Sequence, residues 1–514
     1  MPEAARPPKE PAWAVGSVPA SLISRNPTAW LALFGPGAIM ASLTIGSGEL
    51  IFSSRGGAIF GYRLLWFFSL VLILKWALVF ATARHMILSG AHPLQRWMDL
   101  PGPRGWLPIV FLLLGLACFP IWVSFHAGTV GTLLAALTGT EGIANGGGHF
   151  VWGGAVLVAV LGLALTGGYS RLERVQIGIV ILMLFSVVVS LFLLKPDWWE
   201  LLKGLLVPQA IVYPDWIAGD ARFANRPVWV EAMTYVGVVG GSGYDYLAYT
   251  SYLRDKRWGL AGSRIVGREE LGGLNGERIR SLRLWVRAPL IDCTLSFAAV
   301  LLFSAVFVAC GAVILEPQHR VPAGTTLLTL QAEFVTGNFP WLRWVYFLGA
   351  FLAMLGTLYG TIEVAPTVVR ELRGLWNGDR SPERDQTVRR LTIAWVGGGA
   401  LLVLAGSLVY CLKNEAGGTP PGLVAILTPA NLFTGVLACG LICLTSPWSD
   451  RRFLPEALRM HWGLSGLNLL AGVGFLALGL KAYWDHSGWV AYSILLGTVS
   501  VGWVAAWFLG RRER

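Results

Sequence analysis

Twelve apolar segments, each long enough to cross a lipid bilayer, constrain the fold of this chain more than any other feature. A membrane-spanning helix needs roughly 20 mainly apolar residues, because the hydrocarbon core is about 30 Å thick. Segments of this kind lie at 29–52, 61–83, 107–136, 150–166, 172–194, 229–252, 287–314, 341–365, 391–411, 421–445, 463–481 and 487–509. They predict an all-α polytopic membrane protein with about twelve transmembrane helices.

The composition supports a membrane location and argues against a nucleic-acid partner. Hydrophobic residues make up 55% of the 514 positions and charged residues only 13%, with a mean hydropathy of +0.60, whereas soluble proteins carry about 25% charged residues. The net charge is +11, but no aromatic or zinc module of a nucleic-acid-binding protein accompanies it. The six cysteines lie in or beside apolar segments without a CxxC pair, which predicts buried thiols, and no cofactor is expected.

The loop charges predict the orientation in the membrane. With both termini in the cytoplasm, the inside loops carry roughly three times as many Lys and Arg residues as the outside loops. The first 28 residues lack the features of a signal peptide. We therefore expect a multi-pass protein of the cytoplasmic membrane. The basic link 253–286 is expected near anionic lipid headgroups, and the Trp-rich link 195–228 is expected along the outer interface.

Two of the predicted spans, the first and the sixth, contain the same kind of interruption. Residues 46–49 read Gly-Ser-Gly-Glu, and residues 241–245 read Gly-Ser-Gly-Tyr-Asp. Two glycines weaken a helix, and a carboxylate at membrane depth is costly, so both features together indicate a binding site. The predicted binding residues are Gly46, Ser47, Gly48, Glu49, Gly241, Ser242, Gly243 and Asp245.

The spacing of the two interruptions predicts an inverted repeat. An odd number of spans, five, separates them, so the second set of five helices would be inserted upside down relative to the first. The predicted parts are a cytoplasmic tail (1–28), a first repeat (29–194), an interfacial loop (195–228), a second repeat with the cytoplasmic insert 253–286 (229–445) and two additional helices with a C-terminal tail (446–514).

The chemistry of an interrupted helix suits a charged substrate. Freed carbonyl oxygens and a carboxylate suit a cation, while the positive ends of half-helices suit an anion. Glu49 and Asp245 are the predicted charged ligands, or carriers of a coupling proton. Two plainer interpretations remain open: the glycines let helices pack closely, and each acid stabilises the end of a half-helix.

Other polar residues within the spans are candidates for a proton or ion pathway. They are His126, Thr357, Thr361 and Glu363. Glu363 equally fits an ion pair with Arg370, and His126 a structural hydrogen bond. Lys75, in the second span, is expected to reach the interface or to pair with an acid.

Enzymatic activity is not predicted, because the sequence lacks the necessary parts. There is no HExxH zinc motif, no GxxxxGK[ST] phosphate loop and no GxSxG nucleophile elbow.

The first span resembles a known family. Gly35-Pro36-Gly37, the Gly-Ser-Gly-Glu interruption and the stretch FGYRLLW at 60–66 are similar to those of the natural-resistance-associated macrophage protein (Nramp) family of proton-coupled divalent metal transporters. The resemblance is clear at 35–66 and weaker at 237–252. It implies a leucine-transporter-type 5+5 inverted repeat, broken helices 1 and 6, and symport by alternating access.

The chain departs from the family at the residues that bind metal. Gly46 stands where the family has its metal-binding Asp, and Gly241-Ser242-Gly243 stands where the family has Met-Pro-His. Loss of the Met thioether favours a harder ion, such as Mg²⁺ or Mn²⁺, held by Glu49, Asp245 and backbone carbonyls. The alternatives are a small organic solute such as an amino acid, bound at the same interruptions, and a transporter-like receptor that carries no net flux.

Overall fold

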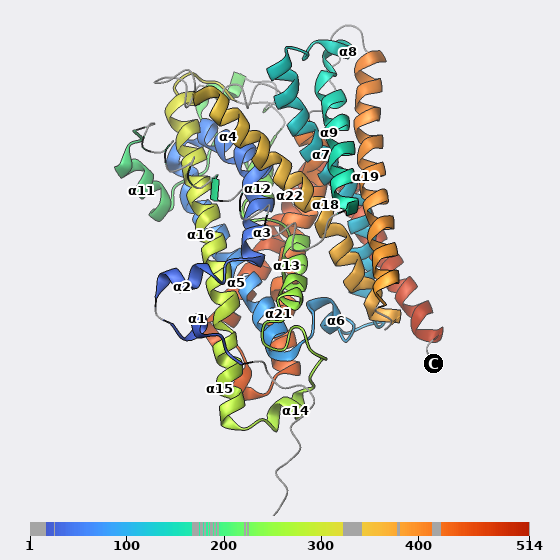
Figure 1. Cartoon of the computed structure of the whole chain (residues 1–514). Coiled ribbons are helices and arrows are strands. Elements are labelled where there is room, and N and C mark those ends of the chain that lie inside the picture. Colours follow the sequence, from blue (N-terminus) through green and yellow to red (C-terminus); the bar gives the residue numbers. More distant parts are fainter. Residues whose placement is uncertain are drawn as a thin grey trace, which may run out of the picture.

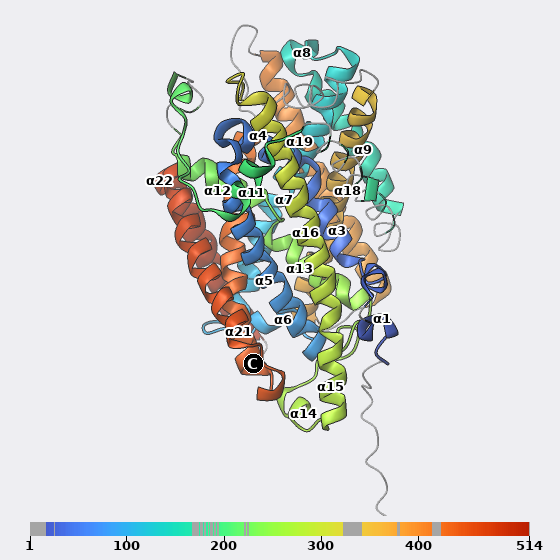
Figure 2. The ribbon, with the colours of Figure 1, turned by 90° about the vertical axis from the view of Figure 1, so that its left-hand side faces the viewer.

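The computed structural model describes residues 17–24, 26–166, 195–219, 226–321, 342–377, 381–413 and 423–512, with a few isolated positions between 174 and 223. Every regular element in these ranges is a helix. The long helices run side by side as one bundle, with α13 (Gly243–Asp255) in its middle in both views (Figures 1 and 2). Short helices lie at both ends, with α8 (Ile143–Gly146) at one end and α14 (Arg268–Gly272) and α15 (Gly276–Trp285) at the other.

Eight helical stretches of the described residues are long and apolar enough to cross a membrane. They are Leu50–Ser89, Trp106–Thr138, Gly148–Thr166, Gly276–Leu315, Phe347–Trp376, Glu383–Lys413, Leu427–Phe453 and Trp462–Arg511. The first and sixth predicted spans are divided into shorter helices, and span 172–194 lies almost entirely outside the described residues. The count of twelve spans therefore stays a prediction.

The last two predicted spans, 463–481 and 487–509, both fall within α22 (Trp462–Arg512). The chain bends there at Gly488, whose φ of 53° and ψ of −132° are not helical. Glycine tolerates this conformation because it has no Cβ atom. The two predicted spans are thus joined by a single-residue bend rather than by a loop.

The first predicted span consists of two helices joined at the Gly-Ser-Gly motif. Helix α3 (Pro36–Thr44) passes through η1 (Ile45–Glu49) into α4 (Leu50–Phe60), and Gly46, with φ −65° and ψ −120°, leaves the helical conformation. Pro36 stands at the first position of α3, where its missing N–H costs nothing.

The sixth predicted span is likewise divided. Helix α12 (Val228–Val238) ends before the glycines, and α13 (Gly243–Asp255) begins after them. Gly240 and Gly241 have φ values of 85° and 99°, a backbone conformation that favours glycine. A capping box between Ser242 and Asp245 starts α13, because each side chain accepts a hydrogen bond from the backbone N–H of the other.

Longer helices surround the two interruptions. Those that pack against α3, η1, α12 or α13 include α5 (Leu65–Ser89), α16 (Arg287–Cys310), α18 (Leu342–Asn377), η5 (Leu432–Leu437) and α21 (Ala438–Phe453). Helix α7 (Trp106–Thr138) packs against α18. Helices α9 (Gly148–Thr166) and α19 (Pro382–Lys413) lie outside α7 and expose apolar side chains such as Val158 and Leu402. Such faces suit contact with lipid.

The two predicted links contain helices of their own. The link 195–228 carries α11 (Trp198–Leu206) and η3 (Asp215–Gly219), and the insert 253–286 carries α14 (Arg268–Gly272) and α15 (Gly276–Trp285). The other helices are α1 (Ala20–Ile23), α2 (Pro27–Leu31), η2 (Gly61–Leu64), α6 (Pro93–Trp97), α8 (Ile143–Gly146), η4 (Gly311–Leu315), α20 (Leu423–Asn431) and η6 (Glu456–Leu458).

Candidate functional site

A small cavity of about 40 Å³ lies between the two interruptions. Residues from α3 and η1, from the α12–α13 junction, and from α7, α18 and η5 line it. This volume holds an ion with a few waters, since one water needs about 10–15 Å³ by the same measure. Its polar lining residues are Thr44, His126, Ser242, Asp245, Thr361 and Thr434. The rest of the lining includes the aromatic rings of Phe119, Trp122 and Tyr244.

Asp245 is the carboxylate of this cavity. Its side chain is half-buried, and its Oδ2 accepts a hydrogen bond of 2.7 Å from the backbone N–H of Ser242. The acid therefore stabilises the start of α13 and faces the cavity at the same time.

Glu49 lies outside the cavity lining. It is fully buried, and its Oε2 accepts hydrogen bonds from the hydroxyl of Ser304 on α16, at 2.7 Å, and from that of Ser53, one turn further along α4. Its side chain makes no capping hydrogen bond to the first turn of α4. In this structure Glu49 neither lines the cavity nor caps α4 with its side chain. Its role as a carrier of a coupling proton stays a prediction.

Lys75, on α5, is the charged neighbour of both acids. Its side chain is 0% exposed, and its Nζ donates hydrogen bonds to the carbonyl oxygens of Val236, Val239 and Gly241 at 2.7, 2.8 and 2.7 Å. It also interacts electrostatically with Glu49 and Asp245. The expectation that Lys75 reaches the interface is wrong, because its ammonium binds the carbonyls freed at the second interruption.

The glycines of the motifs have different neighbours. A Cβ atom on Gly46 would lie 1.7 Å from Thr357 Oγ1 and 2.6 Å from the carbonyl oxygen of Ala353, both on α18. Gly46 thus brings the first interruption against α18, where the Thr357 hydroxyl donates a hydrogen bond of 3.0 Å to the Ser42 carbonyl. Gly243 packs against Ala438 and Ile442 of α21. The Ser47 side chain lies outside the described part of the structure.

The remaining pathway candidates separate into two groups. Thr361 lines the cavity and donates to the Thr357 carbonyl at 2.8 Å, and His126 lines it while stacking on Trp122 with 5.4 Å between ring centroids. Glu363 is not in the cavity lining. It pairs with Arg389 of α19 at 2.5 Å, so Arg389, and not the nearby Arg370, is its partner.

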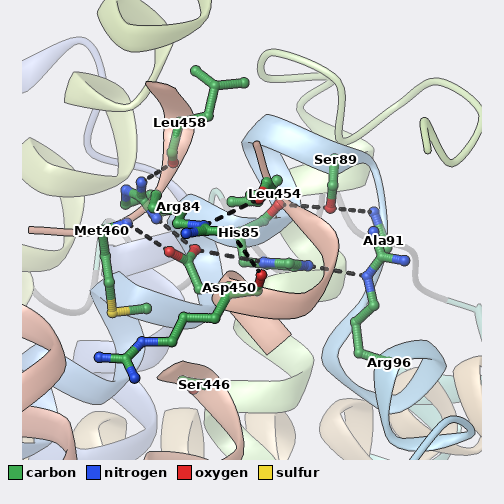
Figure 3. A network of polar contacts seen from close by, with 12 residues as sticks. Arg84, His85, Ser89, Ala91, Arg96, Ser446, Asp450, Leu454, Leu458 and Met460 are labelled. Atoms are coloured by element: carbon green, nitrogen blue, oxygen red, sulfur yellow. Dashed lines mark hydrogen bonds and ion pairs between the residues drawn. The ribbon is translucent and has the colours of Figure 1, made fainter. Parts of the chain in front are cut away.

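The polar network drawn in Figure 3 lies away from these interruptions. Asp450 of α21 accepts from Arg84 of α5 at 2.7 Å and from the Met460 backbone N–H at 2.5 Å, and His85 Nε2 accepts from Arg96 Nε at 3.0 Å. These contacts join α5, α6, α21 and the chain after α21 (Figure 3). The network has a structural explanation and adds no ligand to the cavity.

The donor set of the cavity is rich in oxygen. Within the described residues, no group of three or more His, Cys, Asp or Glu side chains is placed to hold a metal ion. The cavity instead offers one carboxylate, hydroxyl groups, the imidazole of His126 and the thiol of Cys118. A hard cation that keeps part of its water shell fits such a set better than a soft metal does.

A protein-family model identifies the family of this chain. The model of the natural resistance-associated macrophage protein-like family matches residues 37–414, about three quarters of the chain. The chain belongs to this Nramp family. The match includes both interruptions, all of α5 and the predicted pathway residues.

Solved structures share the fold of this chain at low sequence identity. A mutant of the manganese transporter of Eremococcus coleocola is 14% identical, with a TM-score of 0.65, and the match covers 95% of this chain and 96% of that one. MhsT in complex with L-phenylalanine is 16% identical, with a TM-score of 0.50 and coverage of 87% and 98%.

A transporter of the nucleobase-cation-symport-1 family, in a closed conformation with bromovinylhydantoin bound, is 15% identical, with a TM-score of 0.50 and 93% coverage of both chains. A search of the curated proteins finds no sequence match. The structural likenesses support the predicted leucine-transporter-type fold. The number of helices and the extent of each repeat stay predictions.

Proposed function

We propose that this Nramp protein is a secondary active transporter that carries a divalent metal cation of the Mg²⁺ or Mn²⁺ class across the cytoplasmic membrane. The observation that supports the proposal most is the Asp245 carboxylate in a small cavity bounded by both interruptions. Mg²⁺ keeps several waters and needs only one or two carboxylates from a protein. The volume of about 40 Å³ suits such a hydrated ion better than an organic solute.

In this proposal the two acids of the motifs have different tasks. Asp245 contacts the cation directly. Glu49 contributes negative charge from outside the cavity, because its carboxylate is held by the two serines. The Gly241 carbonyl is engaged by Lys75, so the carbonyl ligands are assigned to the first interruption, where Thr44 and Gly48 line the cavity.

Alternating access is supported by the way in which the half-helices are joined in pairs. Arg55 of α4 and Glu231 of α12 form an ion pair of 2.6 Å. Asp292 of α16 accepts hydrogen bonds from the Gly37 backbone N–H at the start of α3 at 2.7 Å, and from the Tyr249 hydroxyl of α13 at 2.9 Å. We infer that α4 moves with α12, and α3 with α13, so that the two interruptions act as hinges between the pairs.

Uptake into proteoliposomes tests the proposed function. Purified protein is reconstituted and challenged with Mg²⁺, Mn²⁺, Ca²⁺ and a panel of amino acids, with binding measured in parallel by calorimetry. Uptake of a divalent ion that falls at least about tenfold in Asp245→Asn is expected, because a hydrogen bond or contact to a charged group contributes about 1.5–3 kcal/mol. Asn at this position still accepts the Ser242 hydrogen bond that caps α13.

Asp215→Asn is the matched control, since Asp215 is exposed in η3 and far from both motifs in sequence. It should leave uptake unchanged. Uptake of an amino acid without any divalent ion would replace the metal proposal by the solute alternative. Binding of the ion without uptake would favour the receptor alternative.

A further inference from the structure

Lys75 is a buried charge that the proposed transport of a divalent ion does not use. A charged side chain within a membrane span is costly unless it finds partners. Lys75 is 0% exposed, and its ammonium has three N–H donors and no acceptor. Each donor meets one backbone carbonyl at 2.7–2.8 Å. All the donors of this ammonium are therefore satisfied by the main chain.

The three carbonyls belong to the end of α12 and to the interruption that follows. Val236 lies in the last turn of α12, while Val239 and Gly241 follow its end. Such carbonyls have lost their helical partners and carry the negative end of the helix dipole. In transporters with discontinuous helices, unwound carbonyls and helix C-terminal ends are the groups that coordinate a free cation such as Na⁺.

Two further features fit an ammonium at this point. Both acids of the motifs, Glu49 and Asp245, interact electrostatically with Lys75, so one positive charge lies near two carboxyl groups. A Cβ atom on Gly240 would lie 3.2 Å from the Cδ of Lys75 and 2.9 Å from Leu72. The glycine therefore leaves room for the lysine side chain to reach the carbonyls.

We propose that Lys75 is a resident cation: its ammonium fills the place at the second interruption that a free monovalent cation would otherwise fill, so this protein needs no such ion there. The proposal goes beyond the proposed function and is independent of it, because it holds whether the substrate is a metal ion or an organic solute. It also bears on which ligands the substrate meets, since the Gly241 carbonyl bonds to Lys75 and does not bind the substrate.

Removing the lysine and supplying a cation from solution tests the proposal. Lys75→Ala deletes three side-chain carbons and the ammonium, and n-propylammonium has the same atoms. Thermal unfolding of the purified protein is measured in choline, sodium, potassium, ammonium and n-propylammonium chloride at equal ionic strength. In choline, Lys75→Ala should unfold about 5 °C or more below wild type, because the carbonyls and acids lose their counter-ion.

At least one of the other cations should recover half or more of that loss, while wild type should shift by less than about 1 °C between the same salts. Thr82→Ala, on the same helix, is the matched control. Thr82 is buried, and within the described residues its hydroxyl bonds to carbonyls of its own helix, so no cation should restore this variant selectively. A Lys75→Ala protein that responds to no cation more than wild type does would overturn the proposal.

Substrate binding adds a readout that a merely structural lysine would not change. Lys75→Ala should bind its substrate in the chloride salt whose cation restores its stability and lose at least about tenfold affinity in choline, whereas wild type should bind equally in both salts. If Lys75→Ala cannot be purified even with n-propylammonium, wild type decides the question. A wild-type protein whose unfolding temperature or substrate affinity depends on Na⁺ or K⁺ would contradict the proposal.

Discussion

The two interruptions share a sequence motif and differ in what their acids do. At the first, Glu49 is fully buried and bonded to Ser304 of α16, outside the cavity. At the second, Asp245 caps its own helix and lines the cavity. Lys75 lies on the carbonyls of the second interruption only. The two interruptions thus share a motif and each divides a helix, while their acids carry different chemistry.

The positions of the acids explain part of this difference. Glu49 follows Gly48 directly, whereas Asp245 comes two residues after Gly243. One residue along an α-helix rotates a side chain by about 100°. The first acid is therefore directed toward α16 and the second toward the cavity. Similar motifs in two helices do not imply equivalent ligands.

The largest expected effect concerns the glycine of the first interruption. Gly46→Ala places a Cβ atom 1.7 Å from Thr357 Oγ1 and 2.6 Å from a backbone carbonyl, and overpacking of this kind costs about 3 kcal/mol of unfolding free energy. Denaturant or thermal unfolding measures it. Gly154→Ala on α9 is the control, because no atom of the described residues, apart from its chain neighbours and the backbone of its own helix, lies within 4 Å of its added Cβ. Equal stability of both variants would show that α18 does not pack closely against Gly46.

A smaller loss is expected at the matching glycine of the second interruption. The Cβ atom of Gly241→Ala meets Thr44 Oγ1 at 3.1 Å, a milder contact, but φ is +99°, which strains any residue with a side chain. We expect a loss of about 1–2 kcal/mol in the same unfolding experiment. If Gly241→Ala lost more unfolding free energy than Gly46→Ala, the first interruption would not be the more tightly packed of the two.

The smallest expected effect concerns the serine that holds Glu49. Ser304→Ala removes the 2.7 Å hydrogen bond and should lower the unfolding free energy by about 1 kcal/mol. The loss is smaller than for an isolated hydrogen bond to a charged group, since Ser53 remains as a partner of the same carboxylate oxygen. The loss should shrink in a Glu49→Gln background. An undiminished loss in that background would mean that Ser304 acts independently of Glu49.

Much of the fold can be predicted from the sequence, because the lengths of the apolar segments and the positions of the glycines determine where helices form and where they are interrupted. The apolar segments, the glycine interruptions and the Nramp resemblance are all local signals, and the family match confirms the resemblance. The sequence does not predict the bend at Gly488 within α22, since a glycine between two apolar segments fits a loop equally well.

The partners of the buried charges could not be predicted from the sequence. Lys75 bonds to residues more than 160 positions away, and Glu363 pairs with Arg389 on another helix. Such pairs depend on how the helices pack against one another, and a single sequence does not show which helices are neighbours. The pair Gly240-Gly241 indicates that another side chain approaches the backbone closely beside the motif, and in the structure that side chain is Lys75.

The unequal roles of the two acids form the central claim, and one binding experiment tests it directly. Calorimetry of the divalent ion is compared for wild type, Asp245→Asn and Glu49→Gln in the same buffer. Asp245→Asn should weaken binding at least about tenfold and Glu49→Gln by less than about threefold, because only Asp245 contacts the ion. Equal losses in the two variants, or a larger loss in Glu49→Gln, would contradict the claim.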